Sequence, residues 1–190
     1  LCYNGEIYNY KQLKKRLEKS GHSFEGNSDT EILLKSIIEW GDECINDLDG
    51  MFAIAYYDKT KNTLLLCRDS SGTKPIYWSK NNNGIIFSSS LKSLFSVGLD
   101  RRLDMDGYKI YEKFGYIPGP KTLIKNVNKL YPGQIIKFDL NSLNQIYNKS
   151  IKFEFDNSNI ASVSHKKFRK KVFDSVEKCL MGNRQIGLYL

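Results

Sequence analysis

The hydrophobic residues of this chain change their spacing close to residue 50, and that change defines the fold class. Before it, Leu33, Ile37 and Trp40 stand three to four residues apart, as on one face of an α-helix. After it, residues 51–57 and 63–67 are short, almost continuous apolar runs, which is the pattern of buried β-strands. A chain that contains both patterns is predicted to pack helices against a sheet, which makes this an α/β protein.

Capping signals and turns place the other elements. The run Ser28-Asp29-Thr30-Glu31 is a capping box, which starts a helix by satisfying its first backbone N–H groups. Asn9 and Gly21 are expected to cap the two ends of an earlier helix, and Asn83-Gly84 is a typical hairpin turn. Further helices are predicted after residue 90, from 104 to 115 and after 164. Further strands are predicted at 1–3, 76–78, 85–88, 134–138, near 146 and at 186–190.

The polar and irregular segment 141–163 is interpreted as a linker. It separates a first domain, residues 1–140, from the beginning of a second domain, residues 164–190. The chain opens at Leu1 without a Met and closes on an apolar run, so both ends are expected to be cut within longer elements.

Composition excludes several classes of protein. The chain is 41% hydrophobic and 13% aromatic, which is enough to fill a core, and no apolar run reaches the roughly 18–20 residues of a membrane-spanning helix. No signal-peptide pattern is present, so a cytoplasmic protein without a membrane partner is expected. The four cysteines and two histidines lack the spacing of metal ligands or of a disulfide framework, so no metal site is predicted.

The net charge of +8 raises the question of a nucleic-acid partner. Most basic residues are scattered over helix faces and turns, and the one dense cluster, 166–171, lies on an amphipathic helix. We interpret this cluster as a solvated face, so no nucleic-acid partner is expected. A nucleic-acid binder would be recognised by a steep dependence of its retention on salt.

Asn4, Gly5 and Glu6 come directly after the first expected strand and have the chemistry of a substrate site. An Asn side-chain amide and a Gly backbone N–H on consecutive residues can stabilise an oxyanion, and a bare Gly lets a carbonyl approach closely. Glu6 adds a negative charge, and Asp29 stands in the first turn of its helix, where the helix dipole favours an ionised carboxylate. These groups suit a neutral amide substrate that also carries an α-amino group. Their spacing alone favours a structural role, because Asn-Gly turns and acidic first turns are common.

The same residues belong to an ordered series of motifs that resembles the glutaminase domain of the asparagine synthetase family. The series comprises Asn4-Gly5-Glu6-Ile7-Tyr8-Asn9-Tyr10, Gly21-His22-x-Phe24, Ser28-Asp29-Thr30-Glu31, Trp40-Gly41, Leu48-x-Gly50-Met51-Phe52-Ala53, Arg68-Asp69-x-x-Gly72-x-Lys74-Pro75-Ile76-Tyr77, Phe87-x-Ser89, Gly115-Tyr116-Ile117-Pro118 and Leu130-x-Pro132-Gly133. Members of this family are class II amidotransferases. The resemblance therefore implies an N-terminal-nucleophile α/β/β/α sandwich, incomplete here, followed by the start of an ATP-pyrophosphatase-type synthetase domain.

By this resemblance, Asn4 and Gly5 supply the oxyanion hole for glutamine hydrolysis. Glu6 and Asp29 hold the α-amino end of glutamine. Leu190 would contact ATP, immediately before the family's Ser-Gly-Gly-x-Asp-Ser pyrophosphate-binding signature.

The family's nucleophile is a Cys at the first position of the mature chain, whose own α-amine acts as the base. This Cys, and an Arg that binds the glutamine carboxylate, would lie upstream of Leu1. Cys2 stands where the family has an apolar strand residue and is expected to belong to the core. The chain as given is therefore expected to bind glutamine weakly at most and not to hydrolyse it.

Arg68, Asp69 and Lys74 belong to a family hallmark that we interpret as structural, shaping a turn near the domain contact. Two departures from the family pattern occur here. Ser70-Ser71 replaces a basic–aromatic pair, and Ser90 stands where family members usually have Glu. Both departures concern the domain contact rather than the glutamine pocket.

In the full-length parent, the resemblance implies that ammonia from glutamine reacts with a β-aspartyl-adenylate made from aspartate and Mg²⁺-bound ATP. The products would be asparagine, AMP and pyrophosphate, and a homodimer is compatible with the family. Because the acceptor site would lie beyond Leu190, a relative that amidates another carboxylate is an open alternative, as in surface-sugar amidation or β-lactam closure. A non-catalytic glutaminase-like interaction module is the other alternative.

Overall fold

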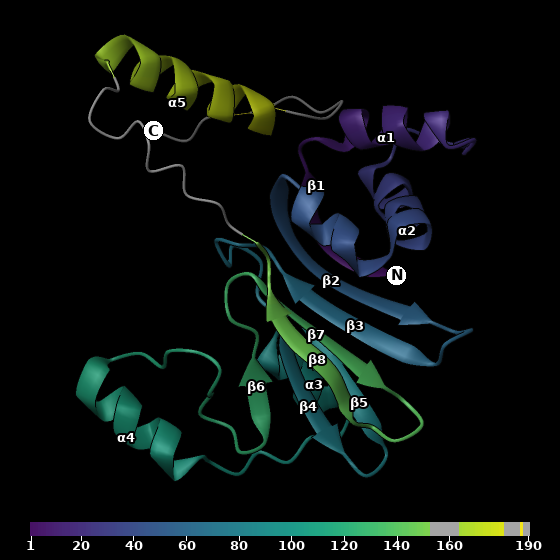
Figure 1. The fold of residues 1–190 in the computed structure, drawn as a ribbon. Coiled ribbons are helices and arrows are strands. Elements are labelled where there is room, and N and C mark those ends of the chain that lie inside the picture. Colours follow the sequence, from purple (N-terminus) through teal and green to yellow (C-terminus); the bar gives the residue numbers. More distant parts are fainter. Residues whose placement is uncertain (153–163, 181–186, 188–190) are drawn as a thin grey trace. The chain divides into compact units, whose positions relative to one another are not determined.

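The computed structural model describes residues 1–152, 164–180 and 187, which fall into two compact units (Figure 1). The first unit consists of residues 1–6 and 50–151. The second consists of residues 7–49 together with the described residues after 151. The chain therefore leaves the first unit after Glu6 and returns to it at Gly50. The α/β class predicted from the hydrophobic spacing is confirmed.

The larger sheet of the first unit has the strand order β1-β2-β3-β7-β8. Its strands are β1 (Cys2–Ile7), β2 (Gly50–Asp58), β3 (Thr63–Arg68), β7 (Gln134–Asp139) and β8 (Gln145–Ser150). The pairs β2–β3, β3–β7 and β7–β8 are antiparallel. The central strand β3 is buried along its whole length, which explains its continuous apolar sequence.

The smaller sheet has the order β5-β4-β6, with both pairs antiparallel. Its strands are β4 (Tyr77–Asn81), β5 (Gly84–Ser88) and β6 (Val127–Lys129). The predicted hairpin is confirmed, but its turn residues are Asn82 and Asn83, one position earlier than predicted, because Asn81 pairs with Gly84. The same unit contains the helices α3 (Leu91–Ser96) and α4 (Met105–Phe114).

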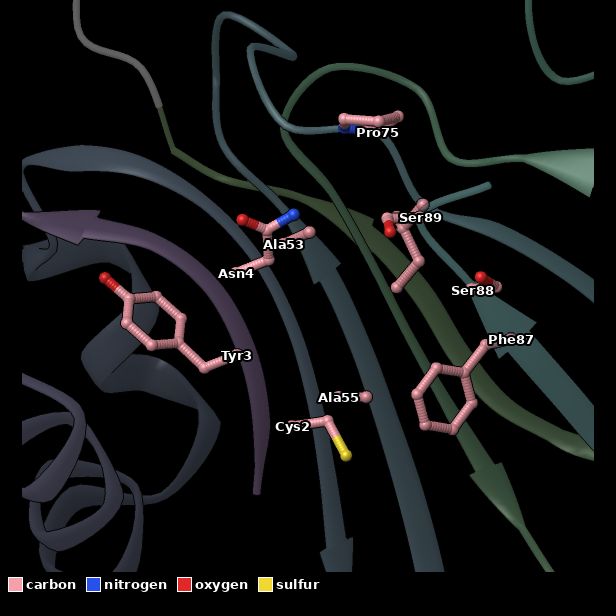
Figure 2. Close-up of a pocket in the computed structure, with 10 residues that line it drawn as sticks. Cys2, Tyr3, Asn4, Ala53, Ala55, Pro75, Phe87, Ser88 and Ser89 are labelled. Carbon is pink, nitrogen blue, oxygen red and sulfur yellow. The ribbon is translucent and has the colours of Figure 1, made fainter. Parts of the chain in front are cut away.

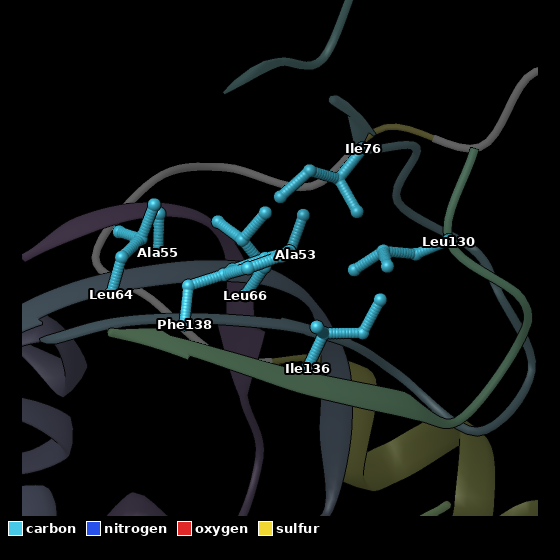
Figure 3. Close-up of a cluster of buried hydrophobic side chains, with 8 residues drawn as sticks. All are labelled: Ala53, Ala55, Leu64, Leu66, Ile76, Leu130, Ile136 and Phe138. Carbon is cyan, nitrogen blue, oxygen red and sulfur yellow. The ribbon is translucent and has the colours of Figure 1, made fainter. Parts of the chain in front are cut away.

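The two sheets pack face to face over a shared hydrophobic core (Figure 3). Trp78 of the smaller sheet meets Phe138 of the larger one, with ring centroids 5.1 Å apart. The buried members of this cluster are Ala53, Ala55, Leu64, Leu66, Ile76, Leu130, Ile136 and Phe138. Tilted aromatic pairs and interleaved aliphatic side chains are typical of the interior between packed sheets. This interior forms the β/β centre of the predicted sandwich.

The second unit contains α1 (Tyr10–Lys19), α2 (Asp29–Trp40), the 3₁₀ helix η1 (Gly41–Asp47) and α5 (His165–Cys179). Helices α1 and α2 contact each other, and η1 continues directly from α2. Arg16 of α1 lies over the Trp40 ring at 4.4 Å and forms an ion pair with Asp47 at 2.8 Å. One side chain therefore joins the two helices to η1.

The predicted capping signals are only partly confirmed. Ser28 caps α2 by accepting a hydrogen bond from the Thr30 N–H at 3.2 Å. Glu31 does not complete the box, because its carboxylate accepts instead from the backbone N–H groups of Glu25 and Gly26. Asn9 is the N-cap residue of α1, as predicted, but its side chain forms no capping hydrogen bond. Its amide binds the backbone on both sides of Leu48, donating to the Asp47 carbonyl and accepting from the Asp49 N–H.

Three expectations concern the C-terminal part of the chain. The strand predicted near residue 146 is confirmed as β8, which pairs with β7, so this strand occupies part of the segment 141–163 that was interpreted as a linker. The helix predicted after residue 164 is confirmed as α5, and the apolar residues on one of its faces are exposed, from 45% at Val172 to 62% at Phe168. The strand expected at 186–190 lies outside the described residues, apart from Gly187.

The four cysteines have free thiols, two exposed and two buried. Burial raises the pKa of the Cys44 thiol to about 12, and the nearby negative charges of Asp42 and Asp47 add to this effect. Because the thiolate is the reactive form, Cys44 remains inert at mildly alkaline pH.

We therefore expect iodoacetamide at about pH 8 to modify Cys2 and Cys179 in the folded chain and to leave Cys44 and Cys67 intact. Peptide mass spectrometry before and after denaturation in urea tests this, because all four thiols become reactive on unfolding. If Cys44 in the native chain were labelled as fast as Cys179, the buried position of Cys44 within η1 would be contradicted.

Over the described parts of the chain, no helix combines the length and the apolar character needed to cross a bilayer. Within the same residues, no group of three or more His, Cys, Asp or Glu side chains is arranged to hold a metal ion.

Candidate functional site

Strand β1 presents Cys2, Asn4 and Glu6 on one face, because side chains alternate along a strand. All three residues are exposed. Among the described residues, nothing forms a hydrogen bond with the Asn4 side-chain amide. An exposed amide without an internal partner can donate to a ligand without first breaking a bond in the protein.

Asn4 lines a pocket of about 170 Å³ in the first unit. In Figure 2, Cys2 and Asn4 project from β1 toward Ala55 and Ala53 of β2, while Tyr3 points away from them. The opposite wall includes Phe87, Ser88 and Ser89. Small side chains on β2 leave the space, and polar groups are present on both walls. This volume is below the roughly 300–1,000 Å³ of pockets for drug-sized ligands, so the pocket fits a small group.

Two expectations about this region need correction or completion. Cys2 was expected to belong to the core, but it is exposed and lines the pocket. Its position on β1, the outermost strand of the larger sheet, explains the difference. Sequence patterns gave no signal for Ser88 and marked Ser89 only as part of a motif. Both residues line the same pocket as Asn4 because the two sheets pack together, and such packing is not visible in a local motif.

Gly5 is required by the packing of β1 against β2. A Cβ atom built at this position would lie 2.0 Å from the Met51 carbonyl oxygen and 2.7 Å from the Phe52 Cα, and φ is +156°. Both neighbours are backbone atoms, which cannot rotate away. The absent side chain at Gly5 therefore allows two strands to approach closely, in addition to any role of its N–H toward a ligand.

Asp29 is the first residue of α2 and is partly buried. Its Oδ2 accepts a hydrogen bond from the backbone N–H of Ile7 at 3.1 Å. Ile7 and Asp29 both belong to the second unit, so this bond lies within that unit. Within the second unit, the Asp29 carboxylate therefore lies in the first turn of α2 and also has a structural partner, the Ile7 N–H.

The Arg68-Asp69 turn has the structural role that the sequence analysis assigned to it. Arg68 is buried and donates to backbone carbonyls, those of Lys74 at 2.8 Å, Leu130 at 2.7 Å and Gly72. Burial lowers the pKa of its guanidinium, and the Asp69 charge opposes this effect. The Asp69 carboxylate in turn accepts backbone N–H groups from its own loop and from β2. This pair therefore holds the loop in place.

Leu190, expected to contact ATP, lies outside the described residues. Asn4 and Glu6 share one face of β1, and Gly5 lies between them. Asp29 belongs to the second unit and is described there by its bond to Ile7.

Comparison with known proteins identifies a family model, the glutamine amidotransferase domain, that matches residues 1–149. Asparagine synthetase [glutamine-hydrolyzing] 3 of Bacillus subtilis is 37% identical over 148 residues, which cover 76% of this chain and 24% of that protein. A putative asparagine synthetase [glutamine-hydrolyzing] of Mycobacterium tuberculosis is 29% identical and covers 100% of this chain and 30% of its own length. The chain therefore spans about a quarter of the length of these relatives.

The fold is also similar to that of a solved structure, the glutamine phosphoribosylpyrophosphate amidotransferase of Bacillus subtilis. The TM-score is 0.57 with 17% sequence identity, over 81% of this chain and 29% of the other. At this identity the likeness concerns the fold alone, and it fits the predicted N-terminal-nucleophile type of sandwich.

Proposed function

Because this chain belongs to the glutamine amidotransferase domain family, we propose that it forms the glutamine-binding part of an asparagine synthetase. Asn4 and the Gly5 N–H stabilise the oxyanion that develops on the glutamine side-chain carbonyl during hydrolysis. Glu6 and Asp29 bind the α-ammonium group of glutamine through charge-assisted hydrogen bonds. The observation that carries this proposal is the exposed Asn4 amide at the small pocket, free of any described partner.

The charges of the two ends of glutamine match these residues. The side-chain amide is neutral and gains negative charge only in the transition state, so it is stabilised by N–H donors rather than by a fixed cation. The α-ammonium is positive and is bound by carboxylates. Glu6 and Asp29 are the two carboxylates that the proposal assigns to this ammonium group.

In the complete parent, glutamine and water would give glutamate and ammonia. Ammonia would then displace AMP from a β-aspartyl-adenylate formed from aspartate and ATP with release of pyrophosphate, and asparagine would result. The names of the matched relatives support this acceptor. The structural support concerns the glutamine half, since Leu190 lies outside the described residues.

Titration of the ¹⁵N-labelled chain with L-glutamine tests the proposal. We expect amide shifts at Asn4, Gly5, Glu6 and Asp29, and about tenfold weaker binding for Asp29→Asn, because the variant loses a charge-assisted hydrogen bond. Asn keeps an oxygen that can accept from Ile7, so the fold is retained.

Asp106→Asn is the matched control, since Asp106 is also an acidic residue in the first turn of a helix but does not line the pocket. Equal effects of the Asp29 and Asp106 variants, or shifts that spare Asn4 and Gly5, would overturn the assignment of this site to glutamine.

A further inference from the structure

A second pocket of the first unit, of about 230 Å³, shares no lining residue with the pocket at Asn4. It lies where β4 and β6 meet the segments that flank α4. Its walls combine three tyrosines, two lysines and aliphatic side chains. The residues that define its chemistry are Tyr77, Tyr111, Tyr116, Leu123, Lys121 and Lys129. We call it the tyrosine–lysine pocket.

Lys129 is one of the two lysines that line this pocket. It is partly buried on β6, and its Nζ lies 5.8 Å from the centre of the Tyr77 ring. No carboxylate in the described chain pairs with it. Burial lowers the pKa of its ammonium, and the nearby positive charge of Arg68 lowers it further. Placing a partly desolvated ammonium beside a second cation is unfavourable, and a bound anion would relieve it.

The rest of the pocket adds to this positive character. Lys121 also lines the pocket. Its one described ion pair is with Asp106, at 3.2 Å. The Asp106 side chain is 74% exposed and does not line the pocket. Among the described residues, no acidic side chain lines the cavity. A zwitterion such as glutamine would find no partner for its ammonium group here, so the chemistry differs from that proposed for Asn4 and Asp29.

The tyrosines provide a surface for an apolar or aromatic body. Tyr111 and Tyr116 are 47% and 63% exposed, although both are large aromatic side chains. Rings that are solvated on one side and adjoin aliphatic walls are typical of binding surfaces, because they offer contact area at low entropic cost. The volume is below the roughly 300–1,000 Å³ of pockets for drug-sized ligands, so the ligand is small.

We propose that the tyrosine–lysine pocket binds a small organic anion. Its carboxylate or phosphate meets the Lys129 ammonium, and its aromatic or branched apolar body lies against Tyr77, Tyr111 and Tyr116. This site is independent of glutamine binding.

Titrations of the ¹⁵N-labelled chain with phenyl phosphate and with benzoate test the proposal and distinguish a phosphate from a carboxylate ligand. We expect amide shifts centred on Tyr77, Leu123 and Lys129. Benzyl alcohol, which has the ring without the charge, is expected to bind about tenfold more weakly, since it lacks the charged hydrogen bond. Inorganic phosphate, which has the charge without the ring, is also expected to bind more weakly. Equal binding of benzyl alcohol and both aromatic anions would overturn the proposal.

Variants assign the effect to individual side chains. Lys129→Met keeps an apolar stem and is expected to weaken phenyl phosphate binding about tenfold. Lys125→Met removes the same charge from an exposed position of the same segment, outside the pocket, and is expected to leave binding unchanged. Tyr116→Ala truncates a mostly exposed ring, so it spares the fold while weakening binding several-fold. Equal losses for the two lysine variants would mean diffuse attraction to a basic protein and would contradict a specific site.

Discussion

Replacing Gly5 by Ala is expected to destabilise the chain by about 3–5 kcal/mol, or to prevent folding, because a steric clash adds to an unfavourable backbone conformation. The added Cβ would lie 2.0 Å from the Met51 carbonyl oxygen. Since the obstacle is backbone, relief requires a shift of β1 away from β2. Such a shift breaks the pairing of the edge strand and displaces Asn4 from its pocket.

Gly84→Ala separates the two causes. Gly84 has φ +143°, close to the +156° of Gly5, but a Cβ built there meets nothing within 4 Å. Gly84→Ala is expected to lower the free energy of unfolding by about 1–2 kcal/mol, which is the cost of the unfavourable backbone conformation without a steric clash. Urea unfolding followed by circular dichroism measures both free energies. Equal losses for the two variants would show that φ rather than close strand packing requires glycine at position 5.

Local signals predicted the elements that depend on neighbouring residues. Ser28 and the apolar spacing that follows it define α2, and Asn83-Gly84 marks the β4–β5 turn to within one residue, because each signal acts within a few residues. Asn9 shows the limit of this reasoning. Its side chain is suited to a cap but binds the backbone at Asp47 and Asp49, about 40 residues away. A local motif cannot reveal a distant partner that competes for the same side chain.

Strands held by non-local pairing were harder to predict. β6 contains only three residues, Val127–Lys129, and exists because it pairs with β4. β8 was predicted only as a strand near residue 146, without bounds, because its mostly exposed and polar residues have the composition of a loop. For the candidate site, motifs selected Asn4, Gly5, Glu6 and Asp29, and their role toward glutamine stays a prediction. The walls of the pocket could not, because Ser88 and Ser89 meet Asn4 only after two sheets have packed.

Removing the negative charge of Asp69 is also expected to lower the stability of the fold by a large amount. The side chain is 1% exposed, and its carboxylate accepts four backbone N–H groups. Oδ1 binds those of Ser71 and Thr73, at 3.1 and 2.9 Å. Oδ2 binds those of Phe52 and Lys74, at 3.2 and 3.0 Å. The bond to Phe52 fixes the loop to β2, next to the Met51 carbonyl that crowds Gly5.

Asp69→Asn should therefore lower the free energy of unfolding by about 3 kcal/mol, since the side-chain NH₂ replaces an acceptor and leaves two backbone N–H groups of the loop without their acceptor. Asp139→Asn is the matched control. Its carboxylate also accepts two backbone N–H groups, those of Asn141 and Ser142, but in a partly exposed turn where water can replace them. Urea unfolding of both variants is expected to show a loss at Asp69 several times that at Asp139. Comparable losses would mean that the Asp69 bonds are replaceable by water, and the loop would then not be the rigid support of β2 that its geometry indicates.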